Sequence, residues 1–172
     1  VIAEPHPETV EHLQTIVAVI ESPPRLGDGR FSHEVVSADT SEMVGLAAGR
    51  MLEGNFSQVP VYRDSAFVGL LTTNSIARWM AAQLAEIGGM LEDVPVEEAL
   101  EYVEASEKYV FRSRRHTVFD ALADFHTHAD RGEELRAILI TENAKKAESL
   151  LGIVTPSEMP QLLAVAGMTR PN

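Results

Sequence analysis

Cysteine is absent from the 172 residues, and basic side chains are scarce, with 14 against 26 acidic ones. Without cysteine the chain has no disulfides, no thiolate nucleophiles and no cysteine-ligated zinc. The formal net charge of −12 argues against a general nucleic-acid binder, because such a protein presents a basic face to phosphates. A small anionic ligand held in a local pocket is still compatible with this charge.

Long hydrophobic runs are missing too, although hydrophobic residues make up 45% of the chain. No apolar stretch approaches the ~20 residues that a membrane span needs. The first ten residues lack the basic segment and apolar core of a secretory signal. We therefore expect a cytoplasmic globular protein that does not bind membranes, with one sizeable domain or two small ones sharing a core.

The chain does contain an internal repeat. The stretches GLLTTNS from Gly69 and GIVTPSE from Gly152 each lead a short apolar run into a threonine and a helix start. When Ser113 is matched to Ser37, the offset between the halves grows by seven residues toward these glycines. We place this change mainly in the polar loop 141–150, which tolerates insertion. A repeat of this length is stronger evidence for the architecture of the fold than any single motif.

Hydrophobic periodicity predicts the same element order in both halves, strand, helix, two hairpin strands and helix. An amphipathic helix over 7–21 precedes them and is expected to cover a sheet edge or to pack across a dimer. In the first half, Asp39 or Thr40 is expected to cap a helix with Met43, Leu46, Ala47 and Met51 turned inward. The predicted helices are 7–21, 39–52, 75–87, 94–103, 117–129 and 159–167, and the predicted strands are 34–38, 58–62, 67–72, 109–113, 135–141 and 150–155.

The matching stretches VVSADTSEMVGLAAGRML and VFRSRRHTVFDALADF, each followed by its hairpin and threonine motif, resemble the cystathionine-β-synthase (CBS) domain. The pair resembles a tandem CBS, or Bateman, module over about 29–167. The resemblance implies an α/β (α+β) fold of two β-α-β-β-α repeats, packed with pseudo-twofold symmetry and preceded by the N-terminal helix. The expected division is 1–28 for helix and linker, 29–90 for repeat 1 and 91–168 for repeat 2.

By resemblance, such modules bind adenosine-containing ligands, namely AMP, ADP, ATP, S-adenosylmethionine or cyclic di-AMP, between the repeats. They regulate an attached or partner protein, and we expect any such partner domain to lie outside this chain. The expected function is therefore a non-enzymatic regulatory module that forms a homodimer and has no tightly bound cofactor. The alternative is a ligand-free dimerisation or scaffold module with degenerate pockets. No nucleophile elbow, phosphate loop or metal-ligand spacing supports an enzyme.

The family's ligand motif is glycine, two apolar residues, a hydroxyl residue, two variable residues and an aspartate that holds the ribose. Ser75 and Glu158 occupy the two aspartate positions, and Glu158 is the better ribose candidate because serine cannot bridge two hydroxyls. Equally, Ser75 is a plain N-cap candidate and Glu158 a capping-box residue. The other candidates are Thr72 and Thr155 for the ligand's phosphate, and Ser57, which matches a ligand-contacting position.

The cluster RSRRH supplies Arg112, Arg114 and Arg115 near the expected phosphate position. Arginine suits phosphate because its planar fork binds two oxygens, but a solvated turn explains the cluster as well. His126 and His128 are two apart on a predicted helix, so they face different sides, and we expect no metal site there.

Overall fold

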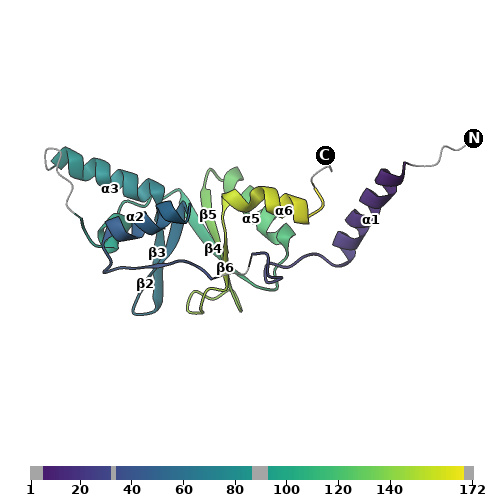
Figure 1. The fold of residues 1–172 in the computed structure, drawn as a ribbon, viewed down its shortest axis with the longest axis horizontal. Coiled ribbons are helices and arrows are strands. Elements are labelled where there is room, and N and C mark those ends of the chain that lie inside the picture. Colours follow the sequence, from purple (N-terminus) through teal and green to yellow (C-terminus); the bar gives the residue numbers. More distant parts are fainter. Residues whose placement is uncertain (1–5, 32–33, 87–92, 169–172) are drawn as a thin grey trace, which may run out of the picture.

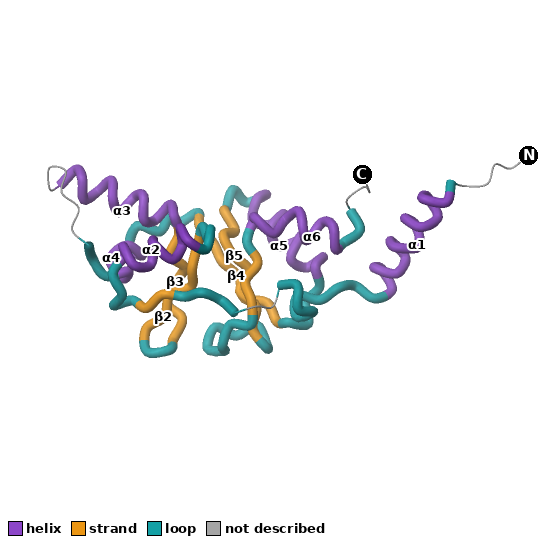
Figure 2. Tube along the Cα trace, viewed as in Figure 1, coloured by secondary structure: helices purple, strands orange, loops and turns teal. Residues whose placement is uncertain are grey.

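Two three-stranded sheets lie next to each other in the middle of the computed structural model, which describes residues 6–31, 34–86 and 93–168 (Figure 1). Helices flank both sheets on their outer sides (Figure 2). The sheets consist of β1 (Ala38–Asp39), β2 (Gln58–Arg63) and β3 (Ala66–Thr72), and of β4 (Glu107–Ser113), β5 (Glu134–Thr141) and β6 (Gly152–Val154). The helices are α1 (Pro7–Glu21), α2 (Val44–Glu53), α3 (Thr73–Glu86), α4 (Val96–Leu100), α5 (Val118–Asp130) and α6 (Met159–Val165), with the 3-10 turn η1 (Pro156–Glu158) before α6.

Both sheets have the same topology. The first strand pairs in parallel with the second, and the second pairs antiparallel with the third. The β2–β3 hairpin turns at Asp64 and Ser65, whose φ angles are both positive, at 48° and 66°. Positive φ at both central residues is typical of a type I′ turn, whose twist matches that of the flanking strands. These findings confirm the predicted repeat of strand, helix, hairpin and helix, and with it the α+β class.

The sheet registers correct the predicted match of Ser113 with Ser37. Ser113 pairs with Thr141 in the second sheet, and Asp39 pairs with Tyr62 at the same place in the first. Ser113 therefore corresponds to Asp39. The longer α5 takes up part of the length difference between the repeats, so the loop 141–150 does not carry most of it.

The start of α2 differs from the prediction. The helix begins at Val44 after Met43, which offers no side-chain cap, and the carboxylate of Asp39 instead accepts the backbone N–H of Ser41 at 2.9 Å. This local bond holds the turn before the helix, so neither Asp39 nor Thr40 is the N-cap. Of the side chains expected to face inward, Ala47 and Met51 are buried, whereas Met43 and Leu46 are exposed.

The lead-in segments of the two repeats are exchanged. Before repeat 1, Leu26 donates its backbone N–H to the carbonyl of His116, and its side chain is buried in the second core. Before the first strand of repeat 2, Val96 donates its backbone N–H to the carbonyl of Glu42 and is buried in the first core. Gly27 lies so close to Arg114 that a larger residue would clash there, because an added Cβ would lie 2.7 Å from the Cβ of Arg114. This reciprocal exchange ties the repeats together in a pseudo-twofold arrangement.

The predicted domain limits at 28/29 and 90/91 stay predictions. The second limit, like the predicted helix end at residue 87, lies outside the described residues.

A third hydrophobic cluster joins the two sheets. Phe67 and Leu70 of the first sheet pack there against Ala137 and Leu139 of the second, all at 4% exposure or less. The ring of Phe67 also makes edge contacts to two aromatic rings of β4. The sheets therefore pack face to face through apolar side chains, which sets the geometry of the seam between the repeats.

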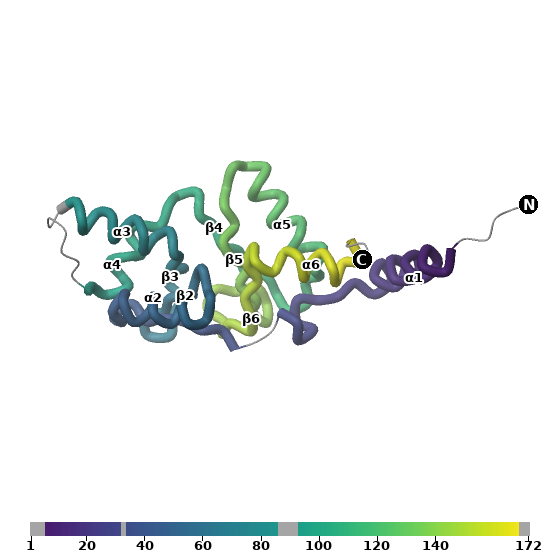
Figure 3. Tube along the Cα trace, turned by 45° about the horizontal axis from the view of Figure 1, so that its top comes forward, coloured from purple at the N-terminus to yellow at the C-terminus, as the bar shows by residue number. Residues whose placement is uncertain are grey.

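Helix α1 has no buried residue and projects past the second repeat (Figures 1 and 3). Its apolar stripe is exposed, with Leu13 at 55%, Val17 at 52% and Ile20 at 69%. Within the chain it therefore covers no sheet edge, which leaves a contact across a dimer as the open alternative. None of the helices in the described ranges has the length and hydropathy of a membrane span.

Candidate functional site

Thr72 and Ser75 cap the start of α3 through reciprocal hydrogen bonds. The hydroxyl oxygen of Thr72 accepts the backbone N–H of Ser75 at 3.0 Å, and the hydroxyl oxygen of Ser75 accepts that of Thr72 at 3.1 Å. Ser75 also donates to the carbonyl of Thr72 at 2.9 Å and is fully buried. Ser75 is thus the third helical residue of a reciprocal cap and not the N-cap. Its hydroxyl is occupied within the chain.

Thr155 and Glu158 form the corresponding cap in the second repeat. One carboxylate oxygen of Glu158 accepts the backbone N–H of Thr155 at 2.7 Å and its hydroxyl at 2.5 Å. The stretches GLLTTNS and GIVTPSE therefore resemble each other because each hairpin ends in a threonine that caps the next helical turn. The same device caps α5, where the backbone N–H of Thr117 holds the pKa of Asp120 below its ordinary value.

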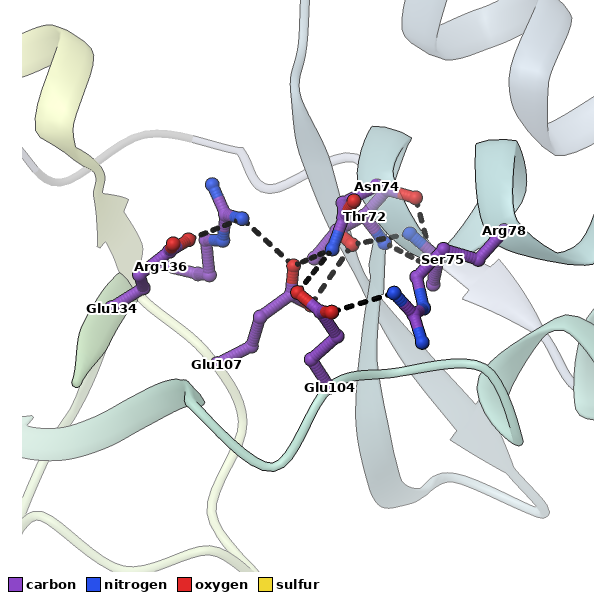
Figure 4. A network of polar contacts seen from close by, with 8 residues as sticks. All are labelled: Thr72, Asn74, Ser75, Arg78, Glu104, Glu107, Glu134 and Arg136. Carbon is purple, nitrogen blue, oxygen red and sulfur yellow. Dashed lines mark hydrogen bonds and ion pairs between the residues drawn. The ribbon is translucent and has the colours of Figure 1, made fainter. Parts of the chain in front are cut away.

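The seam beside Thr72 holds a polar network made by both repeats (Figure 4). At its centre is Glu107, the first residue of β4, whose side chain is only 2% exposed. Its carboxylate accepts the hydroxyl of Thr72 at 3.1 Å, the amide of Asn74 at 2.8 Å and a guanidinium N–H of Arg136 at 2.8 Å. A second arginine, Arg78, pairs with Glu104 at 2.6 Å at the edge of the network.

A cavity of about 220 Å³ opens onto this network. Its polar lining is Thr72, Glu107, Lys108 and Arg136, and its apolar lining comes from β3, α4 and the segments that follow it. A concave site with apolar walls and a few converging polar groups is the usual form of a small-molecule pocket. Because both repeats supply its walls, a ligand here contacts both at once. The cavity is lined by Val68, Gly69, Leu70, Thr72, Leu100, Val103, Glu107, Lys108, Tyr109 and Arg136.

The arginine cluster lies apart from the cavity at Thr72. Arg112 forms a two-pronged ion pair with Asp124 of α5, at 2.7 and 2.5 Å. Arg114 approaches Glu142 at 3.5 Å, and Arg115 is exposed. None of the three lines the cavity. Their role toward a phosphate stays a prediction, and for Arg112 it requires that the bond to Asp124 be given up.

Ser57 lies at the start of the first hairpin, where its carbonyl accepts the N–H of Thr73 at 2.9 Å. It lines a different hollow, of about 440 Å³, between α2 and α3. Its ligand role stays a prediction. The hairpin registers place Arg136 at the position in repeat 2 that Ser57 holds in repeat 1.

Two residues of the seam were missed in the sequence, and only one left a signal there. Arg136 lies three residues before Leu139, as Ser57 lies three before Pro60, so the same spacing rule applied to repeat 2 would have found it. Glu107 left no such signal. Its contact with Thr72 depends on how the two repeats face each other, which local patterns do not encode.

The two histidines of α5 have separate partners. His126 lies 3.3 Å from Asp130, and His128 lies 3.8 Å from Glu133. Across the described parts of the chain, no group of three histidines or carboxylates is arranged to hold a metal ion.

Comparison with known proteins places this architecture. The family model of the CBS domain matches residues 30–82, which contain most of the first repeat. The CBS domain pair of protein MJ0100, solved in complex with 5′-methylthioadenosine and S-adenosyl-L-methionine, superposes with a TM-score of 0.58 at 15% identity, covering 83% of this chain and 97% of that one. The chain folds as a tandem CBS module.

Other CBS structures agree with this fold. The CBS domain of a bacterial CNNM/CorC family Mg²⁺ transporter in complex with ATP gives a TM-score of 0.59 at 15% identity, over 92% of this chain and 99% of that one. CBSX2 in complex with AMP gives 0.57 at 16%, over 82% and 96%. A search of curated proteins finds no match. The second repeat lies outside the matched residues 30–82, so its likeness to the CBS domain rests on the fold alone.

Proposed function

We propose that this CBS pair is a non-enzymatic regulatory module that binds an adenosine-containing ligand in the cleft between its repeats. The observation that carries the proposal is the cavity at Thr72, whose walls come from both repeats. The solved CBS pairs with S-adenosylmethionine, AMP and ATP support the ligand class. The absence of cysteine is in keeping with a cytoplasmic location, which we propose as well.

The regulatory mechanism would follow from the bridging position of the ligand. A molecule that contacts both repeats favours the relative orientation in which both sets of contacts form. It shifts the equilibrium between orientations only by its difference in affinity for them. A regulated partner domain, outside this chain, would read that orientation.

A scaffold without a ligand is the second candidate function. The observation that favours it is Ser75, which replaces the ribose aspartate and whose hydroxyl bonds only to Thr72 in the structure. In that case the seam network would only hold the two repeats together.

A thermal-shift screen separates the two functions. We expect at least one of adenosine, 5′-methylthioadenosine, S-adenosylmethionine, AMP, ADP, ATP, NAD and cyclic di-AMP to raise the melting temperature. A ligand at 100 times its dissociation constant adds about 2.7 kcal/mol to the free energy of unfolding. Thr72→Val should reduce the shift, whereas Thr73→Val, at the exposed neighbour, should retain it. A protein that none of these compounds stabilises would be a scaffold.

We also propose that the module forms a homodimer through α2 and α3. Their outer faces expose apolar side chains at the hollow of about 440 Å³, with Leu52 of α2 at 84% and Met80 of α3 at 37%. Trp79 of α3 is not part of this outer face, because it lies in the core at 5% exposure. A second copy would remove this apolar surface from water.

Light scattering at micromolar concentration should give twice the chain mass of 18.8 kDa. Leu52→Glu should give the single-chain mass, because it places a charge in the interface. Leu13→Glu, on the projecting α1, is the matched control and should remain dimeric. If Leu13→Glu dissociates the dimer and Leu52→Glu does not, the interface is formed by α1 instead.

A further inference from the structure

Glu107 is the one side chain of the seam network that is both charged and almost wholly buried, at 2% exposure. It comes from repeat 2, yet it points at Thr72 in the threonine motif of repeat 1 (Figure 4). Its oxygen lies 3.1 Å from the hydroxyl of Thr72. It therefore occupies the place where a ligand atom bound by that hydroxyl would be.

We infer that Glu107 supplies, from the opposite repeat, the diol-binding carboxylate that repeat 1 lacks, and that the pocket selects a nucleoside with a free ribose diol over its phosphorylated form. This inference rests on the proposed function, since it names the ligand class of the same cavity. Ser75 cannot fill the role because its hydroxyl accepts the backbone N–H of Thr72 and donates to the carbonyl of Thr72.

The carboxylate has the capacity for a diol. An ionised carboxylate offers about four acceptor positions, and in the structure Glu107 accepts from Thr72, Asn74 and Arg136. The bond from Thr72 is the longest of the three, at 3.1 Å. Two ribose hydroxyls can therefore take the free position and the one that Thr72 gives up. The retained bonds from Asn74 and Arg136 hold the carboxylate in place.

Size and the remaining polar groups point to the same ligand class. The cavity of about 220 Å³ is smaller than the roughly 300–1,000 Å³ of typical ligand pockets, which favours a nucleoside over a dinucleotide. Its apolar walls suit a base. The Nε–H of Arg136 is buried and has no acceptor among the described residues, so an acceptor oxygen or nitrogen of a ligand would satisfy it.

A phosphate is disfavoured by the charges around the cavity. Glu107 faces the position that a phosphate oxygen would take, and like charges brought together in a buried site repel. The two cations of the lining already have hydrogen-bond partners within the chain, although the Nε–H of Arg136 has none among the described residues. Arg136 bonds to Glu107 at 2.8 Å and to Glu134 at 2.5 Å, and Lys108 donates to the carbonyl of Ala105 at 2.5 Å.

Calorimetry with adenosine, 2′-deoxyadenosine and AMP tests the inference on the unaltered protein. We expect adenosine to bind at least about tenfold more tightly than 2′-deoxyadenosine, since one hydrogen bond to a charged group is lost. We expect adenosine to bind more tightly than AMP by about the same factor. Equal or tighter binding of AMP would overturn the inference while leaving the proposed function standing. If none of the three compounds, nor any other of the thermal-shift screen, binds, both fail.

Glu107→Gln keeps the shape of the side chain and removes its charge. It should weaken adenosine about ten- to hundredfold and bring the ratio of adenosine to AMP affinity close to one. Glu104→Gln is the matched control, because Glu104 belongs to the same network but does not line the cavity. It should leave the adenosine affinity and the ratio of adenosine to AMP affinity as in the unaltered protein. If Glu107→Gln also leaves the adenosine affinity and this ratio unchanged, the carboxylate does not bind the diol.

Discussion

Replacing Phe67 by alanine is expected to lower the free energy of unfolding by about 3–5 kcal/mol, the usual loss for a buried phenylalanine. Phe67 is 4% exposed and lies between the sheets, with ring centroids of Tyr109 and Phe111 at 5.2 and 5.4 Å. Both of these rings belong to repeat 2. The change therefore removes much of the apolar contact that holds the two repeats together.

Urea unfolding followed by fluorescence and by circular dichroism measures this loss. The single tryptophan, Trp79, lies in the core of repeat 1, so its fluorescence reports that repeat while circular dichroism reports the whole chain. Phe56→Ala is the matched control, because Phe56 is 42% exposed, and it should cost about 1 kcal/mol or less. If Phe67→Ala unfolds like this control, the sheets are not held together through that ring.

Replacing Glu107 by alanine is expected to lower the free energy of unfolding by about 3 kcal/mol, the lower part of the range for a broken buried ion pair. The change leaves Thr72 and Asn74 without the acceptor they share. Arg136 keeps its bond to Glu134 at 2.5 Å, which limits the loss. The midpoint of urea unfolding, at unchanged slope, measures it.

Glu97→Ala is the matched control for Glu107. Glu97 pairs with Arg63, but both side chains are half exposed, so water screens the pair and its loss should cost about 0–1 kcal/mol. Similar losses for the two variants would mean that Glu107 is not a buried anchor of the seam.

Much of the fold could be predicted from the sequence because its signals are local. Apolar runs split by Asp64 and Ser65 define the first hairpin, and a threonine before each closing helix defines its start. The start of α2 was misplaced because Asp39 and Thr40 are good caps by residue type. In the structure, Asp39 bonds to Ser41 within the preceding turn.

The candidate site was predicted only in part, for a physical reason. Thr72 and Ser75 meet within one turn, so their spacing reveals them. Glu107 and Arg136 reach Thr72 only because the two sheets pack face to face. Contacts between distant segments depend on the whole packing arrangement, and no short motif records them. For the same reason, the exchange of the lead-in segments was not predicted.

The most direct test of a ligand site in the seam is a titration of isotope-labelled protein with adenosine, followed by amide chemical shifts. The account predicts concentration-dependent shifts at Thr72, Asn74, Glu107 and Arg136, which lie on both sides of the cavity. The hollow between α2 and α3, at Leu52 and Met80, serves as an internal reference. Shifts at that hollow with none at Thr72 and Glu107, or no shifts at saturating adenosine, would contradict it.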